Sequence, residues 1–155
     1  MTISPLLQAL YQARPEEAEA LRSEQPELDL FESAALGDAG RLRELLDAGG
    51  DPDVFAPDGA TALTLAAFFK RPEAVRLLLE RGADSNLRAR HEEFQVKPIH
   101  SAAANGGSVE IVRLLLEAGA EVDAEQPGGF RAIDAARQEG HSELEQLLLE
   151  RGAAG

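Results

Sequence analysis

The stretch TALTLAAFFKRPEAVRLLLERGAD, residues 61–84, contains two short amphipathic segments separated by a turn. Thr61 is suited to cap a first helix, and Pro72 suits the first position of a second helix. Gly82 ends the second helix, because glycine adopts a left-handed conformation without steric penalty. The residues expected to face inward at helical spacing are Leu63, Ala66, Ala67, Val75, Leu78 and Leu79. The stretch therefore predicts a helix–turn–helix unit.

The end of this unit recurs along the chain. The segments RELLDAGGDPD (43–53), RLLLERGADSN (76–86) and RLLLEAGAEVD (113–123) end alike, and QLLLERGAAG (146–155) closes the sequence. The first glycines of these endings are Gly49, Gly82, Gly119 and Gly152, so the steps are 33, 37 and 33 residues. A fixed period of this size predicts one supersecondary unit stacked on copies of itself.

The segments that precede these endings also match one another. TALTLAA (61–67), KPIHSAA (97–103) and RAIDAAR (131–137) are versions of one first helix, and FESAALGD (31–38) is a weaker version. Together with the Leu-Leu-x-x-Gly-Ala-Asp endings, these segments make residues 29–155 resemble the ankyrin repeat family. The resemblance implies an all-α repeat solenoid of about four repeats, each a helix–turn–helix followed by a β-hairpin or loop.

On this pattern the chain is a single ankyrin-repeat domain, residues 1–155. Residues 1–28 are expected to form a degenerate capping repeat: ARPEEAEAL parallels KRPEAVRLL, but its offset of about 24 residues to the next unit leaves no room for a hairpin. The units expected after it are 29–57, 58–93 with a long hairpin, 94–126, and a C-terminal capping repeat at 127–155. Polar units at both ends predict a complete, closed solenoid.

Composition disfavours several classes of function. The 15 basic and 28 acidic residues give a net charge of −13, which repels phosphate backbones and argues against nucleic-acid binding. The sequence has no cysteine, which excludes disulfides and thiolate metal sites. No apolar run approaches the roughly 20 residues that span a bilayer, and the N-terminal segment lacks the basic start of a secretory signal. We therefore expect no membrane contact and a cytoplasmic protein.

Catalytic and metal-binding patterns are also missing from the sequence. The ankyrin resemblance implies structural roles for His100, at the junction between repeats, and for His141, in a helix turn. His91 stands alone in a connector, so a nucleophile–base pair is not expected. Segment 51–59 has the carboxylates of a calcium loop but lacks its tight-turn glycine. We therefore predict no enzyme activity, no metal and no cofactor.

The 37-residue step marks a departure from the regular repeat. Three of its four extra residues fall in the connector 87–96 and one falls in the turn 105–108. A longer connector predicts a hairpin that protrudes beyond its neighbours. Neutral drift in a tolerant loop explains the length equally well. The connector's arginine, histidine and phenylalanine content nevertheless favours a contact surface.

Phe68 and Phe69 stand side by side at the end of a first helix. The resemblance places both on the inner, concave face of the solenoid, where small or polar residues are usual. Exposed aromatic side chains in a cluster mark binding surfaces. The alternative is that one of the two packs between repeats, where Lys70 replaces the usual turn glycine.

These observations predict a non-catalytic protein–protein interaction module that binds an unidentified partner protein through its concave face and hairpin tips. The predicted contact residues are Phe55, Pro57, Phe68, Phe69, Arg88, Arg90, His91, Phe94, Val96, Asn105 and Phe130. The alternatives are a homodimer formed through the phenylalanines and an accessory subunit of an enzyme. Thirteen of the 15 basic residues are arginine, a bias that resembles small free-standing bacterial ankyrin proteins.

Overall fold

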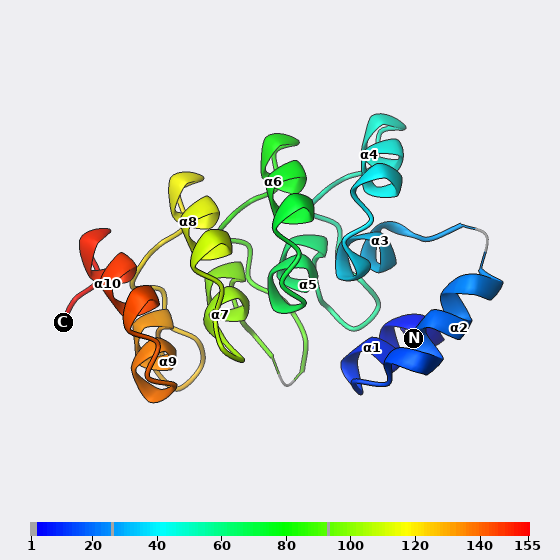
Figure 1. The fold of residues 1–155 in the computed structure, drawn as a ribbon. Helices are drawn as coiled ribbons and strands as arrows, with labels where there is room; N and C mark the ends of the chain where they lie inside the picture. Colours follow the sequence, from blue (N-terminus) through cyan, green and yellow to red (C-terminus); the bar gives the residue numbers. More distant parts are fainter. Residues whose placement is uncertain (1–2, 26, 93) are drawn as a thin grey trace.

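The computed structural model describes residues 3–25, 27–92 and 94–155, and this part of the chain forms ten helices joined by turns and short connectors (Figure 1). The helices are α1 (Pro5–Tyr11), α2 (Pro15–Glu24), α3 (Leu30–Leu36), α4 (Ala39–Asp47), α5 (Ala62–Phe68), α6 (Pro72–Glu80), α7 (Pro98–Ala103), α8 (Val109–Glu117), α9 (Ala132–Gln138) and α10 (Ser142–Glu150).

Consecutive helices pair, and the pairs stack in chain order (Figure 1). The first helices α3, α5, α7 and α9 pack side by side in one layer. The second helices α4, α6, α8 and α10 form another layer, which lies above the first in the view of Figure 1. The structure thereby confirms the predicted all-α repeat solenoid. The residue numbers at which one repeat ends and the next begins stay predictions.

Local sequence signals account for the helix ends. The Thr61 hydroxyl accepts the Thr64 N–H (3.1 Å), and Oγ1 of Thr64 accepts the Thr61 N–H in return (3.0 Å). This reciprocal pair satisfies backbone donors that the first turn of α5 leaves without a partner. Pro72 occupies the first turn of α6, and Gly82 follows that helix with a φ of 88°. The sequence-based reading of 61–84 is therefore confirmed.

The core consists mainly of alanine and leucine side chains. Ala62, Ala66 and Ala67 of α5 are completely buried, and their small size lets neighbouring first helices approach closely. The second helices contribute larger side chains, such as Leu78 and Ile111, which are also fully buried.

The connectors contain less regular β-structure than a β-hairpin would. Within the described residues they contain two isolated antiparallel bridges, Phe55 with Thr61 and Glu125 with Arg131, and no β-strand. The long connector is closed by a hydrogen bond from the Ala89 N–H to the Val96 carbonyl (2.8 Å). Its predicted protrusion involves residue 93, which lies outside the described residues.

Lys70 occupies the turn between α5 and α6 with a φ of 59°, a conformation that favours glycine. Its ammonium group donates to the carbonyls of Ser101 (3.1 Å), Ala102 (3.2 Å) and Ala104 (2.8 Å). These carbonyls lie at the C-terminal end of α7, where helix carbonyls need outside partners and carry partial negative charge. Lys70 thus connects two neighbouring units.

The N-terminal pair α1–α2 covers one end of the stack (Figure 1). Leu7 of α1 is 2% exposed and joins a small apolar cluster with Ala35 of α3 and Leu65 of α5. Leu6 faces α2 instead and packs in a separate cluster with Ala18 and Leu28. Helix α1 therefore contacts α5 as well as α3, and it lies along one side of the first-helix layer.

Candidate functional site

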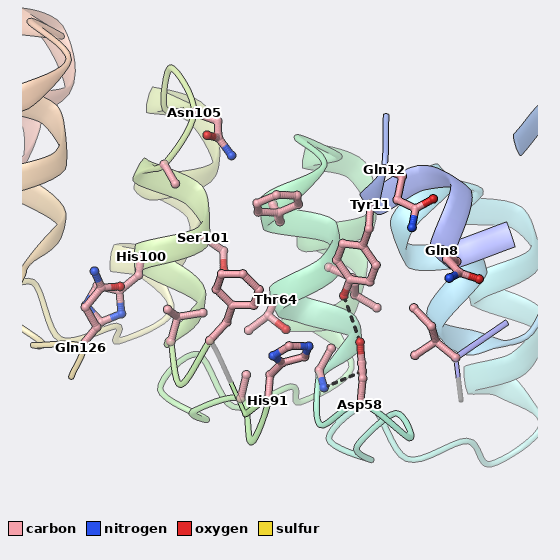
Figure 2. Close-up of a pocket in the computed structure, with 18 residues that line it drawn as sticks. Gln8, Tyr11, Gln12, Asp58, Thr64, His91, His100, Ser101, Asn105 and Gln126 are labelled. Carbon is pink, nitrogen blue, oxygen red and sulfur yellow. Dashed lines mark hydrogen bonds between the residues drawn. The ribbon is translucent and has the colours of Figure 1, made fainter. Parts of the chain in front are cut away.

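A groove with a volume of about 630 Å³ lies on the first-helix side of the solenoid (Figure 2). Residues 8 and 11 of α1 and residue 12 directly after it form one wall, and residues 89, 91, 94 and 96 of the long connector contribute to the opposite side. Side chains of α5 and α7 line the space between these walls, and the turn at 58–60 lines its lower edge. The groove therefore joins the end unit to the middle of the stack.

Three aromatic rings meet at the α1 side of this groove. The rings of Tyr11 and Phe68 have centroids 6.3 Å apart, and those of Tyr11 and Phe69 are 5.7 Å apart. Phe68 and Phe69 contact each other edge to face at 5.0 Å. Phe68 is 36% exposed and lines the groove, whereas Phe69 is half-buried against the cluster that includes Leu65. One phenylalanine therefore faces the groove while its neighbour packs inside.

Asp58 lies at the edge of the groove next to Tyr11 (Figure 2). One carboxylate oxygen accepts the Ala60 N–H (3.0 Å), which fixes the turn, and the other accepts the Tyr11 hydroxyl at a long 3.4 Å. Burial, followed by the negative charge of Asp58 and this hydrogen bond, raises the pKa of Tyr11 well above its usual value. The hydroxyl therefore stays protonated at neutral pH and acts as a donor.

The long connector forms the opposite wall by crossing the 56–60 turn. The Arg90 N–H donates to the Gly59 carbonyl (2.8 Å), so the two connectors lie in direct contact. Gly59 has a φ of 87°, and a Cβ at this position would lie 2.4 Å from the Arg90 carbonyl carbon. Only glycine permits this approach. The crossing places His91 and Phe94 at the groove with ring centroids 5.0 Å apart, and Phe94 is 56% exposed.

His100 is a buried structural residue beside the groove. Nδ1 accepts the Lys97 N–H (3.1 Å), and Nε2 lies 2.7 Å from the Ala124 carbonyl in the next unit. His141 caps α10, where its Nδ1 accepts the Leu144 N–H (3.3 Å). Both structural roles implied by the family resemblance are therefore confirmed.

The structure divides the predicted contact residues into two groups. Those that line the groove are Phe68, His91, Phe94, Val96 and Asn105. Those outside the groove lining are Phe55, Pro57, Phe69, Arg88, Arg90 and Phe130.

The residues outside the groove have other contacts or positions. The Arg90 guanidinium lies over the Phe55 ring, 4.1 Å from its centroid. The Arg88 guanidinium donates to the carbonyls of Gln95 (2.6 Å) and Glu125 (2.8 Å), so it ties the long connector to the next one. Phe130 is half-buried after the 126–130 turn, and Pro57 is exposed. Neither arginine points into the groove lining.

Several groove residues are absent from the predicted set. Gln8 and Tyr11 come from α1, and Gln12 follows it directly. Asp58 lies in segment 51–59, which the sequence marks only as an incomplete calcium loop. Asp58 is the only Asp, Glu, Lys or Arg among the described residues that line the groove. One sequence feature could have indicated Tyr11 as a contact residue: it is the single tyrosine of the chain and lies in the least regular unit.

Neither a metal-binding cluster nor a membrane-spanning helix is found in the part of the chain that the structure describes. Among these residues, no three or more His, Asp or Glu side chains are grouped so as to hold a metal ion. No helix in the same ranges has the length and apolar character needed to cross a membrane.

Comparison with known proteins gives matches along most of the stack. Residues 58–90 match the family model described as "Ankyrin repeat", and residues 87–154 match "Ankyrin repeats (3 copies)". The "Ankyrin repeat and KH domain-containing protein mask" of Drosophila melanogaster is 42% identical over 96 residues, which are 61% of this chain and 2% of that protein. The human "Ankyrin repeat and KH domain-containing protein 1" is 42% identical over 95 residues, 60% of this chain and 4% of that protein.

The "Cyclin-dependent kinase 4 inhibitor B" of Rattus norvegicus matches over a larger share of both chains. It is 29% identical over 119 residues, which are 77% of this chain and 88% of that protein. By contrast, this chain spans only a few per cent of the length of the first two relatives. The family models match the repeats, and the helices stack in pairs as such repeats do. The chain therefore belongs to the ankyrin repeat family.

Proposed function

We propose that this chain is a non-catalytic module that binds a partner protein in the groove between α1, α5, α7 and the long connector. Ankyrin repeats mediate protein–protein interaction in general, which supports the class of function. The observation that carries the proposal is the pair Phe68 and Phe94, two exposed aromatic side chains that line one groove in a chain with only 5% aromatic residues. Aromatic anchors in a concave surface provide much of the binding energy of protein interfaces.

Rigidity of the surrounding structure supports the same proposal. The floor of the groove is formed by α5 and α7, which pack on each other, and Lys70 joins the two units through three hydrogen bonds. The long connector is fixed to the neighbouring turn through Gly59. A surface that is already ordered loses little conformational entropy on binding, so more of the contact energy appears as affinity.

The test compares wild-type protein with Phe94→Ala as affinity baits in a lysate of the source organism. Phe94 is the better choice because it is more exposed than Phe68. The Phe68 ring contacts both Tyr11 and Phe69, whereas the Phe94 ring contacts His91. Truncation of a central aromatic anchor costs about 2 kcal/mol or more, roughly a 30-fold loss of affinity. A protein captured by wild type should therefore be lost from the Phe94→Ala bait.

Two matched controls make this result interpretable. Leu149→Ala and Val54→Ala also remove exposed apolar side chains, 42% and 43% exposed, but neither residue lines the groove. Both control baits should retain the partner. Thermal melting of all four proteins establishes that they are equally folded. Capture that is unchanged in Phe94→Ala would contradict the groove as the binding surface.

A homodimer through the same aromatic residues is the second candidate, favoured by the exposure of Phe94 and of Tyr11, which is 38% exposed. Molar mass measured by light scattering separates the two candidates. A dimer that becomes a monomer in Phe94→Ala indicates self-association through this surface, whereas a monomer in both proteins excludes it. An accessory subunit of an enzyme is one form that the first candidate could take.

A further inference from the structure

The charge of the groove restricts what can bind there. Asp58 is the one residue among its described lining that is an Asp, Glu, Lys or Arg, and it is half-buried. Its outer oxygen has only the long 3.4 Å contact with the Tyr11 hydroxyl, whereas a strong O–H···O bond is about 2.7 Å. The carboxylate therefore keeps capacity for a further donor.

Two cations that neighbour groove-lining residues in the described part of the chain are engaged elsewhere. The Lys70 ammonium donates to three carbonyls of the next unit, and the Arg90 guanidinium lies over the Phe55 ring. The chain as a whole carries a net charge of −13, so its field attracts positively charged ligands. A half-buried carboxylate in an acidic protein favours an incoming cation over a neutral or acidic group.

The aromatic rings add a second requirement. Tyr11 lies beside Asp58, and its ring contacts Phe68 with centroids 6.3 Å apart and planes tilted by 53°. Phe94 lines the groove from the connector. A guanidinium group stacks on aromatic faces and also pairs with a carboxylate through parallel N–H donors. An ammonium group is a more strongly hydrated point charge and matches this combination less well.

We propose that the groove accepts an arginine side chain from an extended, basic segment of a partner protein, with the guanidinium paired to Asp58 and stacked on the Tyr11 ring, and the side-chain stem toward Phe68. Apolar side chains that flank the arginine pack on Phe94 and Val96. This assignment rests on the proposed function, because it specifies the partner for the same groove. It makes Asp58 the residue that selects the ligand, and Phe94 a residue that contributes affinity.

The probe is a phage library of short random peptides, selected on wild-type protein after depletion on Phe94→Ala. The selected peptides should share one arginine with apolar neighbours. The best peptide is then synthesised with a fluorescent label, together with versions in which this arginine is replaced by lysine or glutamine. Dissociation constants are measured by fluorescence anisotropy on wild type, Asp58→Asn and Glu80→Gln.

The protein variants are matched in charge. Asparagine can keep the turn at Asp58, because its side-chain oxygen can still accept the Ala60 N–H. Glu80→Gln removes the same charge from the exposed end of α6, away from the groove lining. Asp58→Asn should weaken the arginine peptide about tenfold or more, since charge-assisted hydrogen bonds are the stronger class. Glu80→Gln should change its affinity less than about twofold, because exposed charges are screened by salt.

Combining the Asp58→Asn variant with the glutamine peptide gives a double-mutant cycle, which separates a direct contact between Asp58 and the arginine from a general effect on folding. If the arginine contacts Asp58, the loss caused by Asp58→Asn should vanish with the glutamine peptide. Equal losses with both peptides overturn the contact. A lysine peptide that binds as well as the arginine peptide overturns the preference for a guanidinium.

The two proposals fail in different ways. Selected peptides that depend on Phe94 but contain no shared basic residue overturn the arginine site and leave the proposed function standing. If no selected peptide depends on Phe94, the groove is not a peptide-binding surface, and the proposed function fails as well.

Discussion

His100 shows how one side chain can make folding depend on pH. The Lys97 N–H donates to Nδ1, so the ring proton lies on Nε2, which donates to the Ala124 carbonyl. A second proton on Nδ1 would remove the acceptor that Lys97 needs. Burial, and to a lesser extent the positive charges of Arg88 and Lys97, lower the pKa of His100, although the bond to Ala124 partly offsets this effect.

We predict that the free energy of unfolding decreases as the pH falls from about 7.5 to about 5.5, and that His100 causes part of this decrease. Below the unfolded-state pKa of about 6.5, the unfolded chain binds a proton that the folded chain resists, so the free energy of unfolding decreases. His100→Gln should lower stability at pH 7.5 by about 1 kcal/mol through weaker hydrogen bonding. It should also make stability depend less on pH.

Urea unfolding of wild type and His100→Gln at both pH values measures these quantities. The difference in unfolding free energy between the two pH values should be smaller in the variant than in wild type. Equal differences would mean that other groups produce the pH dependence.

Side-chain roles were predictable from sequence where the repeat defines a position. His100 and His141 occupy such positions, and both form the expected structural contacts. The choice between Phe68 and Phe69 was not predictable, because neighbouring helix residues point about 100° apart. Which of the two side chains is covered depends on α1, because Tyr11 of α1 packs against both rings. Tyr11 lies about 57 residues earlier in the chain, outside the range of local sequence patterns.

At the scale of elements, the α1–α2 pair is the unit that departs most from the repeat. It is held to the stack through Leu7, which packs against Ala35 and Leu65. Within this structure the pair contacts the stack on one side only, and a unit with a neighbour on one side opens at lower free energy than one with neighbours on both sides. The α1 wall of the groove therefore belongs to a weaker part of the molecule than its floor.

We predict that Leu7→Ala loosens the N-terminal pair without unfolding the remaining stack. Leu7 is 2% exposed, and replacing a buried leucine by alanine costs about 2–5 kcal/mol. Amide hydrogen exchange should show lost protection in α1 and α2, while protection in α7–α10 changes little. Leu149→Ala on α10, where the side chain is 42% exposed, should leave α1 and α2 unchanged. Uniform loss of protection along the chain would contradict this division.

Helix positions were predictable to a greater extent than the groove. Capping residues, prolines at first positions and glycines at helix ends mark the elements of each repeat locally, as Thr61, Pro72 and Gly82 do for α5 and α6. The groove instead needs contacts between distant segments. Gly59 against Arg90 and Tyr11 against Phe68 connect parts of the chain whose spacing carries no periodic signal.

At the scale of the whole molecule, an excess of negative charge opposes compaction. Exposed ion pairs link successive units, among them Arg76 with Glu110 and Arg151 with Glu117, both at 3.7 Å. Such exposed pairs contribute about 0–1 kcal/mol each. The net charge of −13 acts on every unit of the stack at once.

We therefore predict that salt stabilises the protein. Screening weakens the repulsion among the excess negative charges more than it weakens the attraction within the ion pairs. The melting temperature should rise as sodium chloride increases from roughly 20 mM to roughly 500 mM, and it should level off as the screening length approaches about 3 Å near 1 M. Differential scanning calorimetry measures this. A melting temperature that falls over the same range would show that the ion pairs between units outweigh the net charge.

The position of the groove has a consequence for how affinity is set. One wall comes from the end unit and the other from the middle of the stack, so a ligand that touches both requires α1 to be docked. Its observed affinity is then the affinity of the docked form multiplied by the fraction of molecules in that form. In return, the ligand holds α1 in place by mass action. Substitutions at the contact between α1 and α3 can therefore tune binding without touching the ligand.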